Sequence, residues 1–119
     1  NRLVLILFSF LLFACSSDDE TPSLRIVNNG TEDQGIVVVQ LVGYDFQNII
    51  INPGESTTFV LDKGMSGGNT NVNVYIVWRC LRNSIASNIN ISTNFTDGQT
   101  TTITAVNCDP SNCRKLCFE

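Results

Sequence analysis

Short apolar or alternating runs dominate the chain from residue 24 onward, and Gly, Asn, Asp and Pro residues separate them. Within this region no window repeats apolar residues at the i, i+3, i+4, i+7 spacing of an amphipathic helix. The pattern therefore predicts almost no helix and a series of short strands. The segments that we expect to form strands are residues 24–27, 36–42, 44–46, 49–51, 57–61, 72–80, 85–95 and 100–106.

The clearest strand lies at residues 72–80, because every second residue there is apolar. Successive strand residues point to opposite faces, so one face of this strand is expected in a core. Trp78 lies on this face and is interpreted as a core residue packed against a disulfide, with a sugar-stacking platform as the alternative. The residues of the face are Val72, Val74, Ile76, Trp78 and Cys80.

Turn signals separate the strands. Pro53 followed by Gly54 fits the central positions of a type II turn, in which Gly takes a positive φ. Asp97 followed by Gly98 is a hairpin signal. Residues 62–70 contain three glycines and are expected to form a mobile loop.

About seven short strands with frequent turn signals predict an all-β fold, specifically an antiparallel β-sandwich of immunoglobulin-like or fibronectin-like type. Residues 51–59 resemble a strand-turn-strand segment found in bacterial domains of these types. A continuous apolar run at residues 36–42 suggests a central strand covered on both faces. A small barrel is the alternative architecture. Residues 24–119 are expected to form one domain.

Residues 1–14 have the pattern of a secretory signal peptide. The run from Leu3 to Phe13 is apolar except for Ser9, and Arg2 precedes it. Its length of about 11 residues is well below the roughly 20 that a membrane-spanning helix needs. Because residue 1 is Asn and not Met, we expect the natural start to lie upstream.

The next residues, Leu12, Phe13, Ala14 and Cys15, resemble the lipobox of bacterial lipoproteins. The resemblance implies cleavage before Cys15 and attachment of diacylglycerol to its thiol. Fatty chains anchor a protein because each buried CH₂ contributes about 0.8 kcal/mol. The acidic patch that follows the cysteine is similar to an export signal of Bacteroidota lipoproteins, which implies the outer face of the outer membrane. The alternative interpretation is that residues 15–23 are a flexible acidic tether that carries no export signal.

Composition narrows the function classes. The chain has 119 residues, a formal net charge of −4 and no histidine. The shortage of basic residues argues against nucleic acid as a partner. The absence of histidine excludes Ser-His and Cys-His nucleophile pairs. Asp45, Glu55, Asp62 and Asp97 are expected in turns and match no acid/base motif, so no catalytic residue and no cofactor is predicted.

The cysteine count is odd, because the chain holds five. If Cys15 carries lipid, an even set remains, which in an exported chain indicates two disulfides. If the last three long strands form a meander, two of these cysteines finish at the same end of one sheet. This favours Cys80–Cys108 with Cys113–Cys117, and the rival pairing is Cys108–Cys113 with Cys80–Cys117. A four-cysteine zinc site is the alternative chemistry.

Tyr44 and Phe46 are the candidate ligand-binding residues, because Gly43 and Asp45 interrupt the strand and would turn the rings toward solvent. Ordinary strand packing is the alternative for these rings. A calcium site at Asp62 or Asp97 is a further alternative. A further candidate is a flat polar surface that binds a glycan or another chain, formed by two rows of side chains: Asn88, Asn90, Ser92 and Asn94 with Thr100, Thr102 and Thr104.

The lipoprotein resemblance implies a lipid anchor in the outer membrane, facing the exterior, and together with the predicted fold it leads us to expect a non-catalytic binding or adhesion module for a glycan or a surface protein. The alternative is a structural accessory that packs against an envelope complex and has no ligand of its own. Clustered exposed aromatic side chains would favour the binding module. A smooth polar surface or an unpaired strand edge would favour the accessory.

Overall fold

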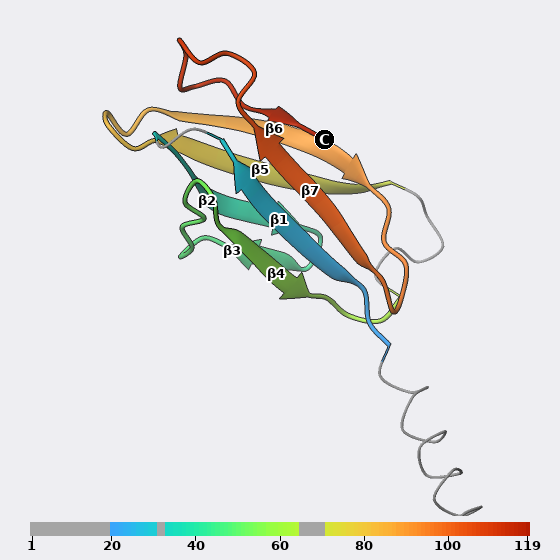
Figure 1. Ribbon diagram of the computed structural model, residues 1–119. Coiled ribbons are helices and arrows are strands. Elements are labelled where there is room, and N and C mark those ends of the chain that lie inside the picture. The colour runs from blue at the N-terminus through green and yellow to red at the C-terminus, as the bar shows by residue number, and fades with distance from the viewer. Residues whose placement is uncertain (1–19, 31–32, 65–70) are drawn as a thin grey trace, which may run out of the picture.

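The computed structural model describes residues 20–30, 33–64 and 71–119, and this part of the chain forms β-strands and no α-helix. Eight strands lie in two four-stranded sheets that pack face to face, which confirms the predicted all-β sandwich (Figure 1). The strands are β1 (Ser23–Asn29), β2 (Gln34–Leu41), β3 (Tyr44–Phe46), β4 (Ser56–Val60), β5 (Val72–Cys80), β6 (Ala86–Thr93), β7 (Thr100–Val106) and β8 (Cys117–Phe118).

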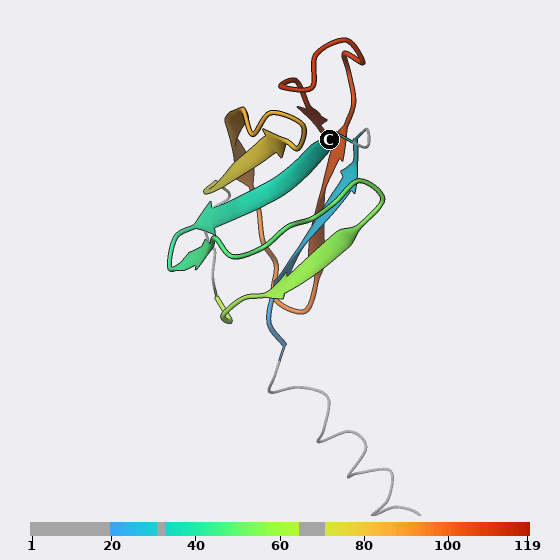
Figure 2. The ribbon, with the colours of Figure 1, turned by 90° about the vertical axis from the view of Figure 1, so that its left-hand side faces the viewer.

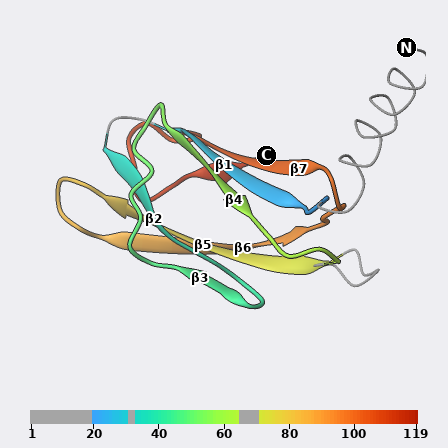
Figure 3. The ribbon, with the colours of Figure 1, turned by 90° about the horizontal axis from the view of Figure 1, so that it is seen from below.

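The first sheet has the order β4-β1-β7-β8 and the second has the order β3-β2-β5-β6, and Figure 3 shows the two layers from below. Neighbouring strands run antiparallel, except β1 and β7, which pair in parallel. Strands β2 and β3, and likewise β5 and β6, are consecutive neighbours in one sheet. The connections β1–β2, β3–β4, β4–β5 and β6–β7 cross between the sheets and interlock them.

Alternation along β5 places every second side chain in the core, as predicted for residues 72–80. Trp78 is only 4% exposed, and its ring centroid lies 5.4 Å from that of Phe118. The interpretation of Trp78 as a core residue is confirmed, because a buried ring cannot serve as a platform for a sugar. Buried residues of the first sheet face β5 from the other layer, and they include Leu24, Ile26, Ile103 and Ala105.

A β-bulge between Ile36 and Val38 interrupts the alternation of β2. The extra residue, Val37, allows both Ile36 and Val39 to point inward, where both are fully buried. Val37 and Val38 are only half-buried. The prediction that residues 36–42 are covered on both faces is therefore wrong, because in the described part of the chain no further layer covers the second sheet.

Both turn signals lie in turns, but only the one at Pro53 and Gly54 forms the turn that was predicted. Glu55 N donates a hydrogen bond of 2.9 Å to Asn52 O, and Gly54 between them has a φ of 85°. Gly98 has a φ of 78°, also in a turn, but this turn connects β6 to β7 in the other sheet. It is therefore not the hairpin turn that the sequence predicts.

Residues 49–51 do not form the expected strand. Ile51 pairs with Ile36 in an isolated antiparallel bridge and is buried, whereas Ile50 is 62% exposed. The chain crosses from β3 in the second sheet to β4 in the first over this stretch, so the backbone cannot follow one neighbour for several residues.

Two disulfides connect the C-terminal part of the chain to the strands: Cys80–Cys113 and Cys108–Cys117, with Cα separations of 5.7 and 5.8 Å. The favoured pairing and its rival are therefore both wrong. β5 and β7 end on the same side of the sandwich but in different sheets. Packed sheets lie about 10 Å apart, too far for one disulfide, and each strand end is linked instead to residues 113–117. All four sulfur atoms are bonded in pairs, which leaves no thiolate for the zinc alternative.

The chain enters the sandwich beside the β6–β7 turn, where Gly98 N donates to Thr21 O. We call this the proximal end, and we call the opposite end, which carries the disulfides, the distal end (Figure 2). The predictions for the signal peptide, Cys15 and most of the tether fall on residues 1–19, outside the described residues. The predicted mobile loop is described only for residues 62–64. In the described ranges no helix is long and apolar enough to cross a membrane.

Candidate functional site

One side of the sandwich is open between the outer strands β6 and β7, and a groove of about 620 Å³ lies there. Residues 89–94, which belong to β6 and the start of the following turn, form one wall. Residues 101–103 of β7, together with Phe118 and Glu119, form the other. The groove therefore lies between the edges of two different sheets.

The wall made by β6 is an unpaired strand edge. Within the described residues β6 pairs with β5 alone, over the whole length of the strand. Cys80 N donates to Ile85 O, so the backbone of Ile85 faces β5. In an antiparallel pair the bonded positions alternate along the strand. The outward backbone groups are consequently those of Ala86, Asn88, Asn90 and Ser92.

The outer edge of β7, on the side away from β1, is paired at its distal half only. β8 contains two residues, which pair with Ala105 and Val106. Thr104 and Glu119 extend this pairing by exchanging two hydrogen bonds of 2.9 Å. In the described part of the chain no strand continues alongside residues 100–103, so this part of the outer edge is open.

The floor of the groove is apolar. Ile89 and Ile91 of β6 are half-buried and pack against the core. Ile103 of β7 is 5% exposed, and Phe118 lies against the ring of Trp78. Water in such a groove covers apolar side chains, and displacing it with apolar groups is favourable.

The groove is closed at its proximal end and carries a charge at its distal end. Thr101 Oγ1 donates a hydrogen bond of 3.0 Å to Asn94 O, and this bond joins the two walls at the proximal end. Among the described residues that line the groove, Glu119 alone is charged, and its side chain is exposed. An occupant with a positive charge at that end would complement the carboxylate.

The opposite side of the sandwich, between β3 and β4, is covered by stacked rings. Phe46 lies between Tyr44 and Phe59, with centroid distances of 5.8 and 4.3 Å. Asp62 N donates a hydrogen bond of 2.7 Å to Tyr44 Oη. Desolvation, followed by the hydrogen bond to the Asp62 carboxylate, raises the pKa of Tyr44, and the hydrogen bond from Asp62 N opposes this rise. Tyr44 and Phe46 are both half-buried, and their predicted role in ligand binding stays a prediction.

The two polar rows do not form the single surface that the sequence suggested. Residues 88–94 belong to the second sheet and its outgoing turn, whereas residues 100–104 belong to the first sheet. Alternation turns these side chains to the outer faces of opposite layers, so the prediction of one flat surface is wrong. Part of each row lines the groove: Asn90, Ser92 and Asn94 on one side and Thr102 on the other.

Two of the carboxylates named for catalysis or calcium binding, Asp45 and Asp97, accept hydrogen bonds from other groups of the domain. Asp45 accepts hydrogen bonds from Gln40 and Gln47, and Asp97 Oδ1 accepts one from Gly64 N. In the described ranges no group of three His, Cys, Asp or Glu residues is arranged to hold a metal ion. Neither alternative gains support from this arrangement.

A second hollow, of about 490 Å³, lies on the outer face of the second sheet. Val37, Val38, Ile50 and Arg79 are among its lining residues. The sequence analysis missed it because the hollow depends on the bulge in β2 and on the exposed crossing at Ile50. Its lining residues belong to the second sheet and to the connection between β3 and β4, and none of them lies on a free strand edge.

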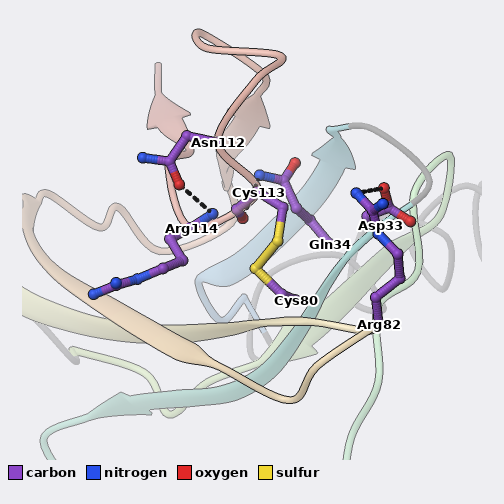
Figure 4. A network of polar contacts seen from close by, with 7 residues as sticks. All are labelled: Asp33, Gln34, Cys80, Arg82, Asn112, Cys113 and Arg114. Atoms are coloured by element: carbon purple, nitrogen blue, oxygen red, sulfur yellow. Dashed lines mark hydrogen bonds and ion pairs between the residues drawn. A yellow bond between two sulfur atoms is a disulfide. The ribbon is translucent and has the colours of Figure 1, made fainter.

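The distal end is braced by the Cys80–Cys113 disulfide and by polar contacts of the segment that follows Asn112 (Figure 4). Gln34 Nε2 donates to Cys113 O at 2.7 Å and to Lys115 O at 3.1 Å. Trp78 Nε1 donates to Arg114 O at 3.1 Å. Because Cys117 in β8 is bonded to Cys108, the bracing also holds Phe118 and Glu119 at the distal end of the groove.

Comparisons of the chain with protein-family models, with curated proteins and with solved structures found no match.

Proposed function

We propose that this protein is a lipid-anchored, non-catalytic envelope protein that docks onto another envelope protein through the groove between β6 and β7. This is the accessory function named above as the alternative. The observation that carries the choice is the free β6 edge beside an apolar groove, because such an edge is suited to pairing with another chain.

The number of cysteines supports the lipid anchor. The chain holds five cysteines, and the two disulfides use four of them. Cys15 is the residue left over, and it is the cysteine of the lipobox-like sequence. The tether at residues 15–23 would join the proximal end, so the anchor and the disulfide-braced end would lie on opposite ends of the domain. We include two further statements in this proposal: the domain is immunoglobulin-like, and it lies on the exterior face of the outer membrane.

The glycan-binding version of the module has less support. Sugar recognition by stacking needs an aromatic face open to solvent. Trp78 is buried, and at the closed side of the sandwich Tyr44 is stacked on Phe46, which is stacked on Phe59. The open side presents isoleucines and backbone groups instead, which match a polypeptide better than a sugar.

Site-directed photocrosslinking in native membranes tests this proposal. A benzophenone amino acid is placed at Asn90, on the rim of the groove, and at Thr58, an exposed residue of the opposite edge strand β4, as the matched control. We expect an envelope protein to be crosslinked from Asn90 and not from Thr58. Equal crosslinking from both positions, or none from Asn90, would contradict docking at the groove.

The anchor is tested separately by intact-mass measurement on protein purified from its native membranes. We expect the mass of diacylglycerol on a chain that begins at Cys15. A free Cys15 thiol would contradict the anchor and leave the groove experiment unaffected. The domain is also tested for glycan binding, with and without a charged residue in place of Ile91 in the groove. If it binds glycans and this charge does not weaken the binding, the glycan-binding module becomes the better proposal.

A further inference from the structure

We propose that the groove receives an extended segment of the partner protein as an additional strand, antiparallel to β6, with a basic residue facing Glu119. This inference rests on the proposed function and specifies how the partner is bound. Strand addition is a recognised mode of peptide binding, in which the backbone provides affinity and alternate side chains provide specificity.

The backbone of β6 provides the hydrogen bonds. The outward groups of Asn90 and Ser92 lie in the wall of the groove, those of Asn88 lie just beyond it on the same strand edge, and all of them face away from β5. β6 contains no charged residue and no proline, the usual devices that protect an exposed edge from pairing. Its length of eight residues makes it long enough to align an added strand.

The apolar floor determines the side chains of the added strand. A strand beside β6 alternates its side chains, so every second one points between the sheets. Those side chains would contact Ile89 and Ile91 from one side and Ile103 from the other, all of which line the groove. The segment should therefore carry aliphatic residues at alternate positions where it runs along residues 89–93 of β6.

Antiparallel pairing is slightly more stable per residue than parallel pairing, and the charge at Glu119 then determines at which end of the segment the basic residue lies. β6 runs from the distal end to the proximal end, so an antiparallel occupant runs toward the distal end and toward Glu119. Its basic residue should then follow the aliphatic positions in the sequence. Because Glu119 is exposed, this contact contributes to direction and specificity more than to affinity.

A second copy of this chain fits the groove less well than a partner does. Each copy has a net charge of −4, and β6 offers no basic residue to Glu119. Pairing of two β6 edges would bury little surface. Eight residues at about 3.3 Å each, with an edge about 10 Å deep, give roughly 500 Å² for both copies, about half of the ~1,000 Å² expected of a stable interface.

The experiment uses two synthetic peptides and the domain of residues 20–119, which contains the whole described core and both disulfides. The first peptide is acetyl-Thr-Ile-Thr-Val-Thr-Ile-Lys-amide, and the second is its reversed sequence with Lys first. Binding is followed by amide NMR shifts and by hydrogen exchange. We expect the first peptide to bind two- to fivefold more tightly than the second, and to slow exchange at the amides of Asn88, Asn90 and Ser92 at least tenfold.

Backbone pairing is tested by removing single donors. Asn90→Pro removes an outward N–H, whereas the control Asn90→Ala keeps it and removes only the side chain. We expect at least tenfold weaker binding by Asn90→Pro and little change in Asn90→Ala. Peptides N-methylated at every second residue, made in both phases, give the same test without altering the domain. At least one phase should bind tenfold more weakly.

Charge recognition is tested with Glu119→Lys, and Glu55→Lys on a distant turn is the control. We expect Glu119→Lys alone to remove the preference for the first peptide.

The proposal is overturned if neither N-methylated phase weakens binding, if the three β6 amides are not protected, or if no peptide binds. A dimer in sedimentation that the peptide disperses would assign the groove to a second copy. If no peptide binds but crosslinking from Asn90 is still observed, strand addition is contradicted and docking at the groove remains supported.

Discussion

Gln34 and Cys113 lie 79 positions apart in the chain, and the side-chain Nε2 of Gln34 donates a hydrogen bond of 2.7 Å to the carbonyl oxygen of Cys113. The same nitrogen donates to Lys115 O at 3.1 Å. Gln34 is fully buried at the first position of β2. The start of one strand is thereby connected to the segment that braces the distal end.

Replacing this glutamine should destabilise the domain. In Gln34→Leu the carbonyl oxygens of Cys113 and Lys115 lose a buried donor, and such a loss costs about 1–3 kcal/mol. Gln47→Ala is the matched control, because Gln47 is exposed and bonds only to Asp45 among the contacts that the structure shows. Its effect should stay within about 0.5 kcal/mol. Urea unfolding followed by Trp78 fluorescence measures both, and equal stability of the two variants would contradict a role for Gln34.

The two disulfides should contribute unequally. Cys80–Cys113 spans 33 positions and Cys108–Cys117 spans 9. In the chain-entropy model these loops correspond to about 3.7 and about 2.6 kcal/mol. The double variant Cys80→Ala with Cys113→Ala should therefore lose more stability than Cys108→Ala with Cys117→Ala.

Burial adds to this difference, because Cys80 is fully buried whereas Cys108 is exposed. Thermal unfolding of the two double variants provides the measurement. Peptide mapping of the unreduced wild-type protein checks the connectivity itself. A peptide that links Cys80 to Cys108 would contradict the structure, and a larger loss from the shorter loop would contradict the entropic account.

Asp109 should make the stability sensitive to acid. The hydroxyl of Ser111 donates to Asp109 Oδ1 at 2.7 Å and the Ser111 amide at 3.1 Å, and together they lower the pKa of Asp109 below its ordinary value of 3.8. A lowered folded pKa means that the carboxylate stabilises the fold above that ordinary value. The contribution is lost as the pH falls through the folded pKa.

The variant Ser111→Ala removes the stronger of the two donors. We expect the pKa of Asp109 to rise toward its ordinary value, and the acid dependence of stability near that pH to become weaker. Carboxyl NMR titration measures the pKa, and Asp109→Asn serves as the control that removes the titrating group. An unchanged Asp109 pKa in Ser111→Ala would show that the hydroxyl is not its cause.

The fold class was predictable from the sequence because its evidence is local. The alternation from Val72 to Cys80 needs only the two-residue period of a strand, and the Pro53–Gly54 turn needs only the φ preference of glycine. The disulfide pairing could not be predicted in this way. It depends on whether β7 returns beside β6 or crosses to the other sheet, and no local pattern around Asp97 and Gly98 distinguishes these paths.

The groove was missed for the same reason. Ile89 and Ile91 are typical inward residues of a strand, and their pattern does not reveal that the edge beside them stays open. The one available signal was the absence of charge in residues 86–93, since exposed edges normally carry Lys or Pro for protection. Conversely, the prediction for Tyr44 and Phe46 relied on the break at Gly43, whereas the position of both rings depends on Phe59, a distant partner in the other sheet.

Phe46 should act as a structural residue of the closed side. Its ring is stacked on Phe59 at 4.3 Å and is packed against the core, so Phe46→Ala should cost about 2–3 kcal/mol, somewhat less than for a fully buried Phe. Ile50→Ala is the matched control. Ile50 is an apolar residue of the same region but 62% exposed, and its loss should change stability by no more than about 0.5 kcal/mol. Urea unfolding of both variants checks this. If Phe46→Ala is as stable as Ile50→Ala, the ring is not needed to close the sandwich and its predicted role in binding a ligand gains support.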